Sequence, residues 1–502
     1  MYRLRLNRQH ILIGIGTLSF VYILLSLSGY TTQSGLLSFL SLSGEGRCKR
    51  PTNGLISELV GGVPGFFVLE NVWFRNETFY LHNPSHESVP TEKQLLTGKV
   101  NLVIEPEPIR YQPDHCFDKT SLFLNEGAEP GWNGLWHYYH FAAENILGGF
   151  AALSTTDSWK QSQSQSQSQS QSNELGWNTP EYPSRLLIPW EPGWKDVWGM
   201  NEMVIKALFG KNLVDAKKWS KLTGRGTEWI FFDKIILVDR WTAHRNHPES
   251  NQWNKMALPI FESKPKPSPS FFNEARRRML IYQGIKDMEF SHLPPPPPPP
   301  PPPAHSHEFE YEDEREDAFE HQQGHGHGHG PGPGPEPGYP FHENDQINKI
   351  VYIDRQNTTR KLYDEDHESL MQVLKDFDKR PNVEILHVLL ENLDGKNQIK
   401  AVADATVMIG IHGNGLTHEM WMPQESTLIE IFPVGAFLRD YQLVADVLGH
   451  NYVAIRNDTA LSAEECIKLG AEQEAGKTHD GTQIPLDPDV VRQVLNTILD
   501  NQ

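Results

Sequence analysis

A glycine-containing turn between two apolar segments is the stretch of the sequence best suited to hold an anionic ligand. Thr406–Ile411 and Ser426–Phe432 are short, apolar, β-branched runs, typical of strands buried on both faces of a parallel sheet. Between them, His412-Gly413-Asn414-Gly415 lead into an expected helix start at Leu416–Met422. Glycines permit a tight turn, and the free N–H groups of a helix N-terminus bind phosphate. The motif therefore predicts a phosphate site, with an ordinary strand-to-helix turn as the alternative.

Two arginines flank a polar loop that follows another expected strand, Ile350–Arg355. A guanidinium group is always charged and binds two phosphate oxygens at once, so Arg355 and Arg360 suit a diphosphate. Glu430, near the end of the strand after the glycine turn, could reach the hydroxyl pair of a ribose. Surface arginines are common, so their spacing alone leaves a solvated role open.

An aromatic segment in the N-terminal half, Trp136–Phe150, could supply a general base. If it is helical, His137, His140 and Glu144 fall on one stripe. A histidine and a glutamate one turn apart can fix the imidazole tautomer or shift the pKa of the carboxyl group towards neutrality. Either side chain could then accept a proton from an attacking hydroxyl. The alternative is an aromatic helix whose histidine and glutamate only satisfy each other.

A second polar segment, Asp239–His247, follows the apolar strand Lys234–Val238. Open α/β sheets bind ligands beyond the carboxyl ends of their strands. His244 and Arg245 could therefore face an acceptor or a sugar, and a solvated loop is an equal alternative.

The IHGNGLTH segment and the downstream EIFP resemble the nucleotide-sugar site of glycosyltransferase family 61, especially of its fungal members. Those members are similar to lumenal O-linked N-acetylglucosaminyl- and xylosyltransferases. The order strand, Arg355, loop, Arg360 is similar to the family's second signature. His140 and Glu144 match a third element, in which His137 takes a place often held by asparagine. The resemblance covers most of residues 60–460.

This resemblance implies a GT-B architecture, with two Rossmann-like lobes and the donor mainly on the C-terminal one. It implies an inverting transfer, in which a hydroxyl of a glycan or glycoprotein acceptor attacks the anomeric carbon of a UDP-sugar while UDP leaves. Arg355, Arg360 and the His412–Gly415 turn would stabilise the leaving diphosphate. Glu430 would bind the nucleoside.

The expected base is Glu144, slightly ahead of His140, because a carboxylate is the commoner base in inverting transfer. No Asp-x-Asp motif of the kind that holds a metal ion is evident, since the acidic run Glu312–Asp317 lies in a low-complexity tract. We therefore expect no required cofactor, only the UDP-sugar as co-substrate, and a divalent metal ion is left open but not indicated.

Apolar and amphipathic segments alternate in the second half and predict a parallel, right-handed βαβαβ lobe. Together with the first half they predict an α/β protein of two lobes. The expected organisation is a cytosolic tail at 1–10, a transmembrane anchor at 11–29, a stem at 30–55, an N-terminal lobe at 56–290 with a Gln/Ser loop at 160–173, a disordered insert at 291–345 and a nucleotide-sugar-binding lobe at 346–502.

The insert contains a proline block, an acidic block and a His-Gly tract, none of which can build a core. His325, His327 and His329 could bind a metal ion, as histidine-rich tracts do, although we expect no physiological metal role for them.

The apolar run Ile11–Leu27 follows three arginines and is long enough to cross a bilayer. The charge bias puts the N-terminus in the cytosol, so a type II protein of the Golgi or the ER, with a lumenal catalytic domain, is expected. A cleaved signal peptide is the alternative. Sequons at Asn76 and Asn457 fit a lumenal location. Cys48, Cys116 and Cys466 allow one disulfide and one free thiol.

Charge and composition exclude some functions. A net charge of −19 argues against a nucleic-acid partner. A glycoside hydrolase would need two catalytic carboxylates in one cleft, and no such pair stands out. A non-catalytic lumenal scaffold that binds a glycan or a nucleotide is the competing class, and UDP release would separate it from an enzyme. The sequence does not separate xylose, N-acetylglucosamine and arabinose donors.

Overall fold

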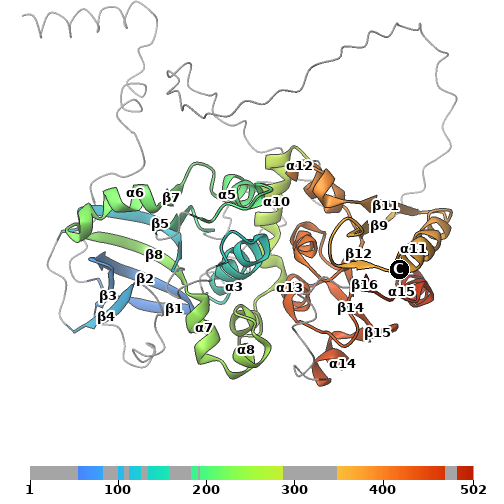
Figure 1. Cartoon of the computed structure of the whole chain (residues 1–502). Helices are drawn as coiled ribbons and strands as arrows, with labels where there is room; N and C mark the ends of the chain where they lie inside the picture. The colour runs from blue at the N-terminus through green and yellow to red at the C-terminus, as the bar shows by residue number, and fades with distance from the viewer. Residues whose placement is uncertain are drawn as a thin grey trace, which may run out of the picture.

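The chain forms two α/β lobes that lie side by side (Figure 1). The computed structural model describes residues 55–82, 100–106, 112–125, 134–157, 182–189, 193–285, 347–469 and 483–500. The predicted anchor, the Gln/Ser repeat, the Pro/His-rich insert and Cys48 lie outside these ranges. Among the helices inside them, none is long and apolar enough to cross a membrane.

An eight-stranded mixed sheet forms the centre of the N-terminal lobe. In spatial order its strands are β4 (Asn101–Glu105), β3 (Thr78–His82), β2 (Phe66–Arg75), β8 (Ile230–Val238), β5 (His115–Leu124), β6 (Arg185–Ile188) and β7 (Leu213–Asp215), and β1 (Glu58–Val63) also pairs with β2. The run β8-β5-β6-β7 is parallel, as predicted, whereas β1, β2 and β3 pair antiparallel, as do β2 and β8. The sheet of this lobe is therefore mixed, and the parallel sheet expected of a Rossmann-like lobe is only part of it.

The antiparallel part arises from a tight hairpin between β2 and β3. Asn76 and Glu77 form its turn with positive φ angles of 47° and 56°, the conformation of a type I′ turn. Asn457 and Asp458, at 50° and 54°, form the same kind of turn between β14 (Asn451–Arg456) and β15 (Thr459–Ser462). The asparagines of both predicted sequons thus lie exposed at hairpin tips, where asparagine is also favoured by the turn itself.

Helices cover both faces of this sheet. They are η2 (Tyr139–Leu147), α3 (Gly148–Ser154), α5 (Met200–Phe209), α6 (Ala216–Leu222), η3 (Gly224–Gly226), α7 (Arg240–Asn246), α8 (Pro248–Trp253), α9 (Leu258–Phe261), η4 (Pro269–Phe272) and α10 (Asn273–Gln283). Helix α3 packs so closely that a Cβ atom on Gly148 would lie 2.6 Å from the ring of Phe66. The small residues at the start of α3 therefore bring η2 and its polar side chains against the sheet.

The sheet of the C-terminal lobe has the order β11 (Val383–Val388), β9 (Asn348–Ile353), β12 (Val407–Ile411), β13 (Thr427–Ile431), β14 and β15. All pairs are parallel except β14–β15, which confirms the predicted parallel strands. The chain runs outwards from β9 to β11 and then returns to β12. This reversal creates a topological switch point between β9 and β12, where sheets of this kind bind ligands.

Two layers of helices also enclose this second sheet. Its helices are α11 (Asp364–Phe377), η5 (Leu390–Asn392), α12 (Gly395–Val402), η6 (Asn414–Trp421), α13 (Asp440–Leu448), α14 (Ala463–Lys468) and α15 (Pro488–Asp500), and β10 (Lys361–Leu362) pairs with β16 (Gln483–Ile484) in a small separate sheet. Side chains of α11 and α15 share one buried cluster with one face of the sheet. The other face shares a cluster with α12, η6 and α13, and this second cluster continues into the N-terminal lobe.

Buried hydrogen bonds join the lobes where this common core passes between them. The indole N–H of Trp421 donates to the hydroxyl of Tyr138 at 2.7 Å. Arg276, on α10 between the lobes (Figure 1), donates to the carbonyls of Trp421 and Ala403 at 3.0 and 2.7 Å. These contacts hold η2 of one lobe against η6 of the other.

The two described cysteines differ in state. Cys116 on β5 is disulfide-bonded, whereas Cys466 on α14 is a free, buried thiol. This fits the expected combination of one disulfide and one free thiol.

Candidate functional site

The predicted glycine turn follows β12 at the switch point. Gly413 has φ 150° and immediately precedes η6, a 3₁₀ helix that begins at Asn414. The helix thus starts earlier than expected from the sequence and is wound more tightly. This places Asn414 and Gly415 in its first turn, next to the end of β9.

Two guanidinium groups converge on this turn, as the sequence predicted. Nη1 of Arg355 and Nη1 of Arg360 donate to the same carbonyl, that of His412, at 2.9 and 2.5 Å. A Cβ atom on Gly413 would overlap the guanidinium group of Arg355, so only glycine permits this approach. Burial and the neighbouring Arg360 lower the pKa of Arg355 to about 10, so both groups remain cations at neutral pH.

Glu430 does not face the site, contrary to expectation. Its side chain is 0% exposed, and both carboxylate oxygens are occupied: Oε1 lies 2.5 Å from Nδ1 of His412, and Oε2 accepts from the hydroxyl of Tyr452 at 2.6 Å. Burial raises the pKa of Glu430 despite these partners. A carboxylate so enclosed cannot reach a ribose. It instead orients the imidazole of His412.

A pocket opens directly in front of the turn and is lined by both lobes. The C-terminal lobe provides an apolar floor and several polar groups, and the N-terminal lobe provides a largely aromatic wall. Its lining residues are Ile353, Asp354, Arg355, Thr358, Leu390, Glu391, Gln398, Ile411, Asn414, Gly415, Leu416 and His418 on one side, and Tyr138, Trp198 and Met200 on the other. The pocket therefore lies at the switch point and is closed by the second lobe, the usual position for a ligand in such a sheet.

The segment with His140 and Glu144 is a π-helix, η2, rather than the expected α-helix. Stretches of π-helix are rare and are frequently found at functional sites. Nδ1 of His140 lies 2.7 Å from Oε2 of Glu144, and that oxygen also pairs with Nη1 of Arg240. The predicted His–Glu pair is therefore formed, with an arginine as an additional partner.

The buried ion pair makes Glu144 a weak base. Burial alone would raise its pKa, but His140 and Arg240 together lower it to about 2. A carboxylate with so low a pKa stays ionised and has little affinity for a proton. His140, whose side chain is 18% exposed, is the more accessible member of the pair.

The remaining predicted contacts lie around this pair. The ring of His137 is 4.9 Å from that of His140, and burial together with His140 lowers the pKa of His137 to about 4, so it is neutral. His244 and Arg245 lie on α7, not in a loop, because the side chain of Asp239 accepts from the N–H of Thr242 and caps a helix. Arg245 is exposed, and His244 is half-buried.

One short link joins the two halves of the site. The side-chain oxygen of Asn414 accepts from the backbone N–H of Tyr139 at 3.1 Å, so the glycine turn and the π-helix are in direct contact. The hydroxyl of Tyr139 donates to the carbonyl of Asp440, which begins α13. The segments singled out in the sequence therefore meet at the interface between the lobes.

Two charged residues of this interface were not identified from the sequence. Arg240 is the buried cation that pairs with Glu144. Asp440 forms an ion pair with Lys255 of the other lobe, with 2.6 Å between Oδ2 and Nζ. Arg240 directly follows the strand-end residue Asp239, and that position was its only sequence signal. Nothing local distinguishes Asp440.

Comparison with known proteins identifies the family of this chain. The sequence profile of the family described as Glycosyltransferase 61 matches residues 138–429, more than half of the chain. A beta-1,2-xylosyltransferase of Arabidopsis thaliana is 34% identical over 73 residues, 14% of this chain and 14% of that protein. An EGF domain-specific O-linked N-acetylglucosamine transferase of Drosophila melanogaster is 26% identical over 93 residues, 18% of this chain and 17% of that protein. The matched segments thus span less than a fifth of either relative.

Proposed function

Because the chain belongs to glycosyltransferase family 61, we propose that it transfers a sugar from a UDP-sugar to a glycan or glycoprotein acceptor. The observation that carries this proposal is the convergence of Arg355 and Arg360 on the His412–Gly415 turn, at the mouth of a pocket between two α/β lobes. We further propose that the lobes correspond to a GT-B arrangement, with the donor on the C-terminal lobe.

The diphosphate would lie against the glycine turn. Arg355 and Arg360 carry positive charge there, and Gly413–Gly415 add backbone N–H groups at the start of η6. The uridine would occupy the pocket at the end of β9, where Trp198, 56% exposed, offers an aromatic face. Glu430 would act indirectly, by orienting His412.

The proposed reaction is a single displacement with inversion. The acceptor oxygen forms a bond to the anomeric carbon as the bond from that carbon to the diphosphate oxygen breaks, and UDP leaves with the electron pair. The two guanidinium groups would stabilise the charge that develops on the diphosphate.

The acceptor proton would pass to His140. Since Nδ1 of His140 faces the carboxylate of Glu144, the proton-accepting atom would be Nε2. Glu144 then stabilises the imidazolium that forms, instead of accepting the proton itself as expected from the sequence. His137, His244 and Arg245 stay candidates for contacts with the acceptor or the sugar.

We also propose the cellular setting expected from the sequence: a type II membrane protein of the Golgi or ER, anchored by residues 11–29, with its catalytic part in the lumen. The sequons at Asn76 and Asn457 would be glycosylated there. Resistance to carbonate extraction and protease protection in sealed microsomes would test the topology.

A donor screen tests the activity. Purified protein is incubated with UDP-xylose, UDP-N-acetylglucosamine or UDP-arabinose and a panel of glycan acceptors, and released UDP is measured. We expect acceptor-dependent UDP release with one donor, lost in Arg355→Ala. UDP binding without release for any donor and acceptor would favour the competing role, a non-catalytic scaffold of the same fold.

A further inference from the structure

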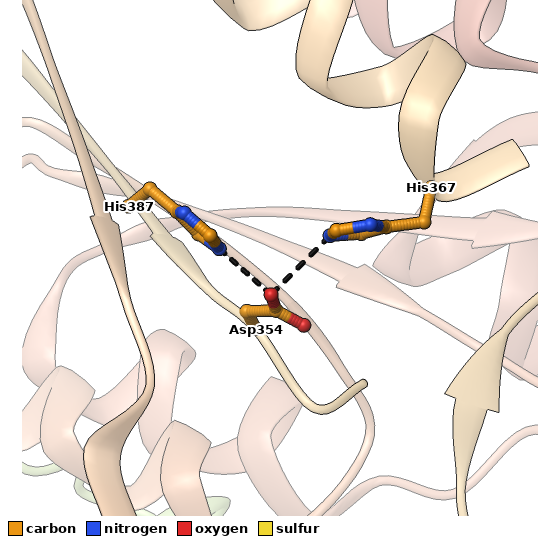
Figure 2. A group of neighbouring side chains, drawn as sticks. All are labelled: Asp354, His367 and His387. Atoms are coloured by element: carbon orange, nitrogen blue, oxygen red, sulfur yellow. Dashed lines mark hydrogen bonds and ion pairs between the residues drawn. The ribbon is translucent and has the colours of Figure 1, made fainter. Parts of the chain in front are cut away.

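Three side chains of types that can bind a metal ion meet beside the proposed donor pocket, and one of them, Asp354, also lines it (Figure 2). Asp354 follows β9, His387 lies on β11 and His367 lies on α11. Oδ2 of Asp354 is 2.7 Å from Nε2 of His387 and 3.3 Å from Nε2 of His367. The three atoms all lie within 4.8 Å of one another.

Hydrogen bonding alone does not account for this group. The contact between Asp354 and His367 lacks hydrogen-bond geometry, so the buried Nε2 of His367 has no hydrogen-bond partner in the described part of the chain. Oδ1 of Asp354 already accepts from the N–H of Gln356 at 2.7 Å. Oδ2 forms a hydrogen bond with Nε2 of His387 at 2.7 Å, and Nε2 of His367 faces the same oxygen without a hydrogen bond (Figure 2).

We propose that Asp354, His367 and His387 form a binding site for a divalent transition metal, with Zn²⁺ as the preferred ion. Two imidazole nitrogens and one carboxylate oxygen are a common ligand set for zinc, with water in the fourth position. Ligand atoms about 2.1 Å from a tetrahedral zinc ion lie roughly 3.4 Å apart. Shifts of less than about 1 Å bring the observed separations to that value.

The surroundings hold the ligands in place. The ring of Tyr352 stacks on His387 with centroids 5.6 Å apart and lies 6.0 Å from the ring of His367. Asp354 is buried, whereas His387 is exposed, so the ion can be reached from solvent and its fourth position can hold water.

The ion would connect three elements that are distant in sequence: β9, β11 and α11. Asp354 immediately precedes Arg355, so the ion would fix the start of the loop that carries both arginines. Its role is to stabilise this part of the lobe, and no step of the transfer passes through it. The short-range spacing of a sequence motif cannot reveal the site, because the fold brings its residues together.

Zinc binding by the full-length protein tests the proposal, once the His-Gly tract has been silenced. The background variant carries His325→Gln, His327→Gln and His329→Gln, because those histidines could bind zinc on their own. Titration calorimetry with ZnCl₂ should give one ion per chain, and zinc should raise the melting temperature. Adding His367→Gln or His387→Gln should weaken zinc binding at least about tenfold. Loss of a residue that only hydrogen-bonds to a metal ligand already costs that much.

His115→Gln, a half-buried histidine on β5 of the other lobe, is the matched control and should leave zinc affinity unchanged. Co²⁺ provides a second readout: its visible absorption in the background variant should disappear in His387→Gln. The proposal is overturned if the background variant binds no zinc, or if both His367→Gln and His387→Gln bind it as tightly as the background. Loss of zinc in His115→Gln to the same extent would also overturn it.

Discussion

At the scale of single residues, the site depends on which charges meet. Arg355 and Arg360 point at one carbonyl, and no carboxylate oxygen lies within ion-pair distance of either in the described residues. Two cations held this close repel each other unless an anion joins them. This arrangement supports the proposal that the pair binds an anionic ligand.

We predict that Arg355→Ala or Arg360→Ala weakens UDP binding roughly ten- to a hundredfold. Each change removes a charge-assisted contact worth about 1.5–3 kcal/mol. Titration calorimetry with UDP measures the effect. Arg492→Ala, on α15 and distant from the pocket, serves as control and should bind UDP normally. Unchanged UDP affinity in both Arg355→Ala and Arg360→Ala would show that the diphosphate does not bind at these arginines.

Proton transfer gives a second prediction at this scale. His140→Ala should lower turnover by about 10²–10⁴-fold, the usual contribution of a general base, with UDP affinity nearly intact. Glu144→Gln should also slow turnover, because the imidazolium loses its anionic partner. Added imidazole should restore part of the activity of His140→Ala but none of that of Glu144→Gln. An active His140→Ala beside an inactive Glu144→Gln would identify the carboxylate as the base.

Glu419 allows a prediction about stability and pH. It is 0% exposed, and neither carboxylate oxygen has a hydrogen-bond partner in the parts of the chain that are described. Burial, and secondarily Glu430 and Asp446, raise its pKa well above the ordinary value. The folded state therefore binds this proton more tightly than the unfolded state. The resulting contribution to the free energy of unfolding is fully present below the unfolded pKa of about 4.3. It is lost as the pH rises towards the folded pKa of Glu419.

Glutamine is neutral at every pH and avoids that loss. Glu419→Gln should match the parent protein near pH 4 and become progressively more stable than it as the pH rises from the unfolded towards the folded pKa of Glu419, by at most about 1.4 kcal/mol for each pH unit. Urea unfolding at several pH values measures the difference. The exposed Glu368→Gln on α11 should show no such trend. A stability difference independent of pH would mean that Glu419 is ionised in the fold.

At the scale of elements, the parts that could be predicted are those with local signals. Strands β9, β12 and β13 and the glycine turn follow from apolar runs and glycine positions, and the structure places them as expected. The π-helix could not be predicted, because its residues also fit an α-helix. Glu430 was assigned to the ribose because its partner Tyr452 could not be foreseen. Tyr452 lies on β14 and reaches Glu430 only because β14 pairs with β13 in the folded sheet.

The same reasoning applies to partners that arrive from distant segments. His140 and then Arg240 lower the pKa of Glu144 against the effect of burial, and that arginine lies at the start of a helix which the sequence suggested was a loop. Local patterns therefore located the candidate residues, while the roles within the His140–Glu144 pair depended on tertiary contacts.

The glycine turn itself can be tested as an element. Gly413→Ala should weaken UDP binding, because the new methyl group displaces the guanidinium group of Arg355 from the turn. In an Arg355→Ala background the same change should cost much less, with the backbone strain at φ 150° and a close contact with Arg360 remaining. A double-mutant cycle on UDP affinity measures this coupling. Effects that add to within about 0.5 kcal/mol would show that the two residues act independently.

At the scale of the whole molecule, the site exists only because the lobes are held together. A single buried cluster and the bonds of Arg276, Tyr138 and Trp421 cross the interface, and all of them come from the described helices and strands. The low-complexity insert lies between α10 and β9 in the sequence, outside the residues that the structure describes.

We therefore predict that deleting residues 294–340 leaves the protein folded, with a melting temperature unchanged or slightly raised. The deletion shortens the 286–346 connection from 61 to 14 residues, about two halvings, and for a flexible loop this stabilises by about 1.2 kcal/mol. In a chain of this size that amounts to roughly one to two degrees. Arg276→Ala is the comparison variant and should lower the melting temperature, because two buried carbonyls lose their donor at about 1–3 kcal/mol each. Scanning calorimetry of the three proteins decides the matter. A broadened or strongly lowered transition in the deletion variant, comparable to that of Arg276→Ala, would mean that the insert itself contributes to the contact between the lobes.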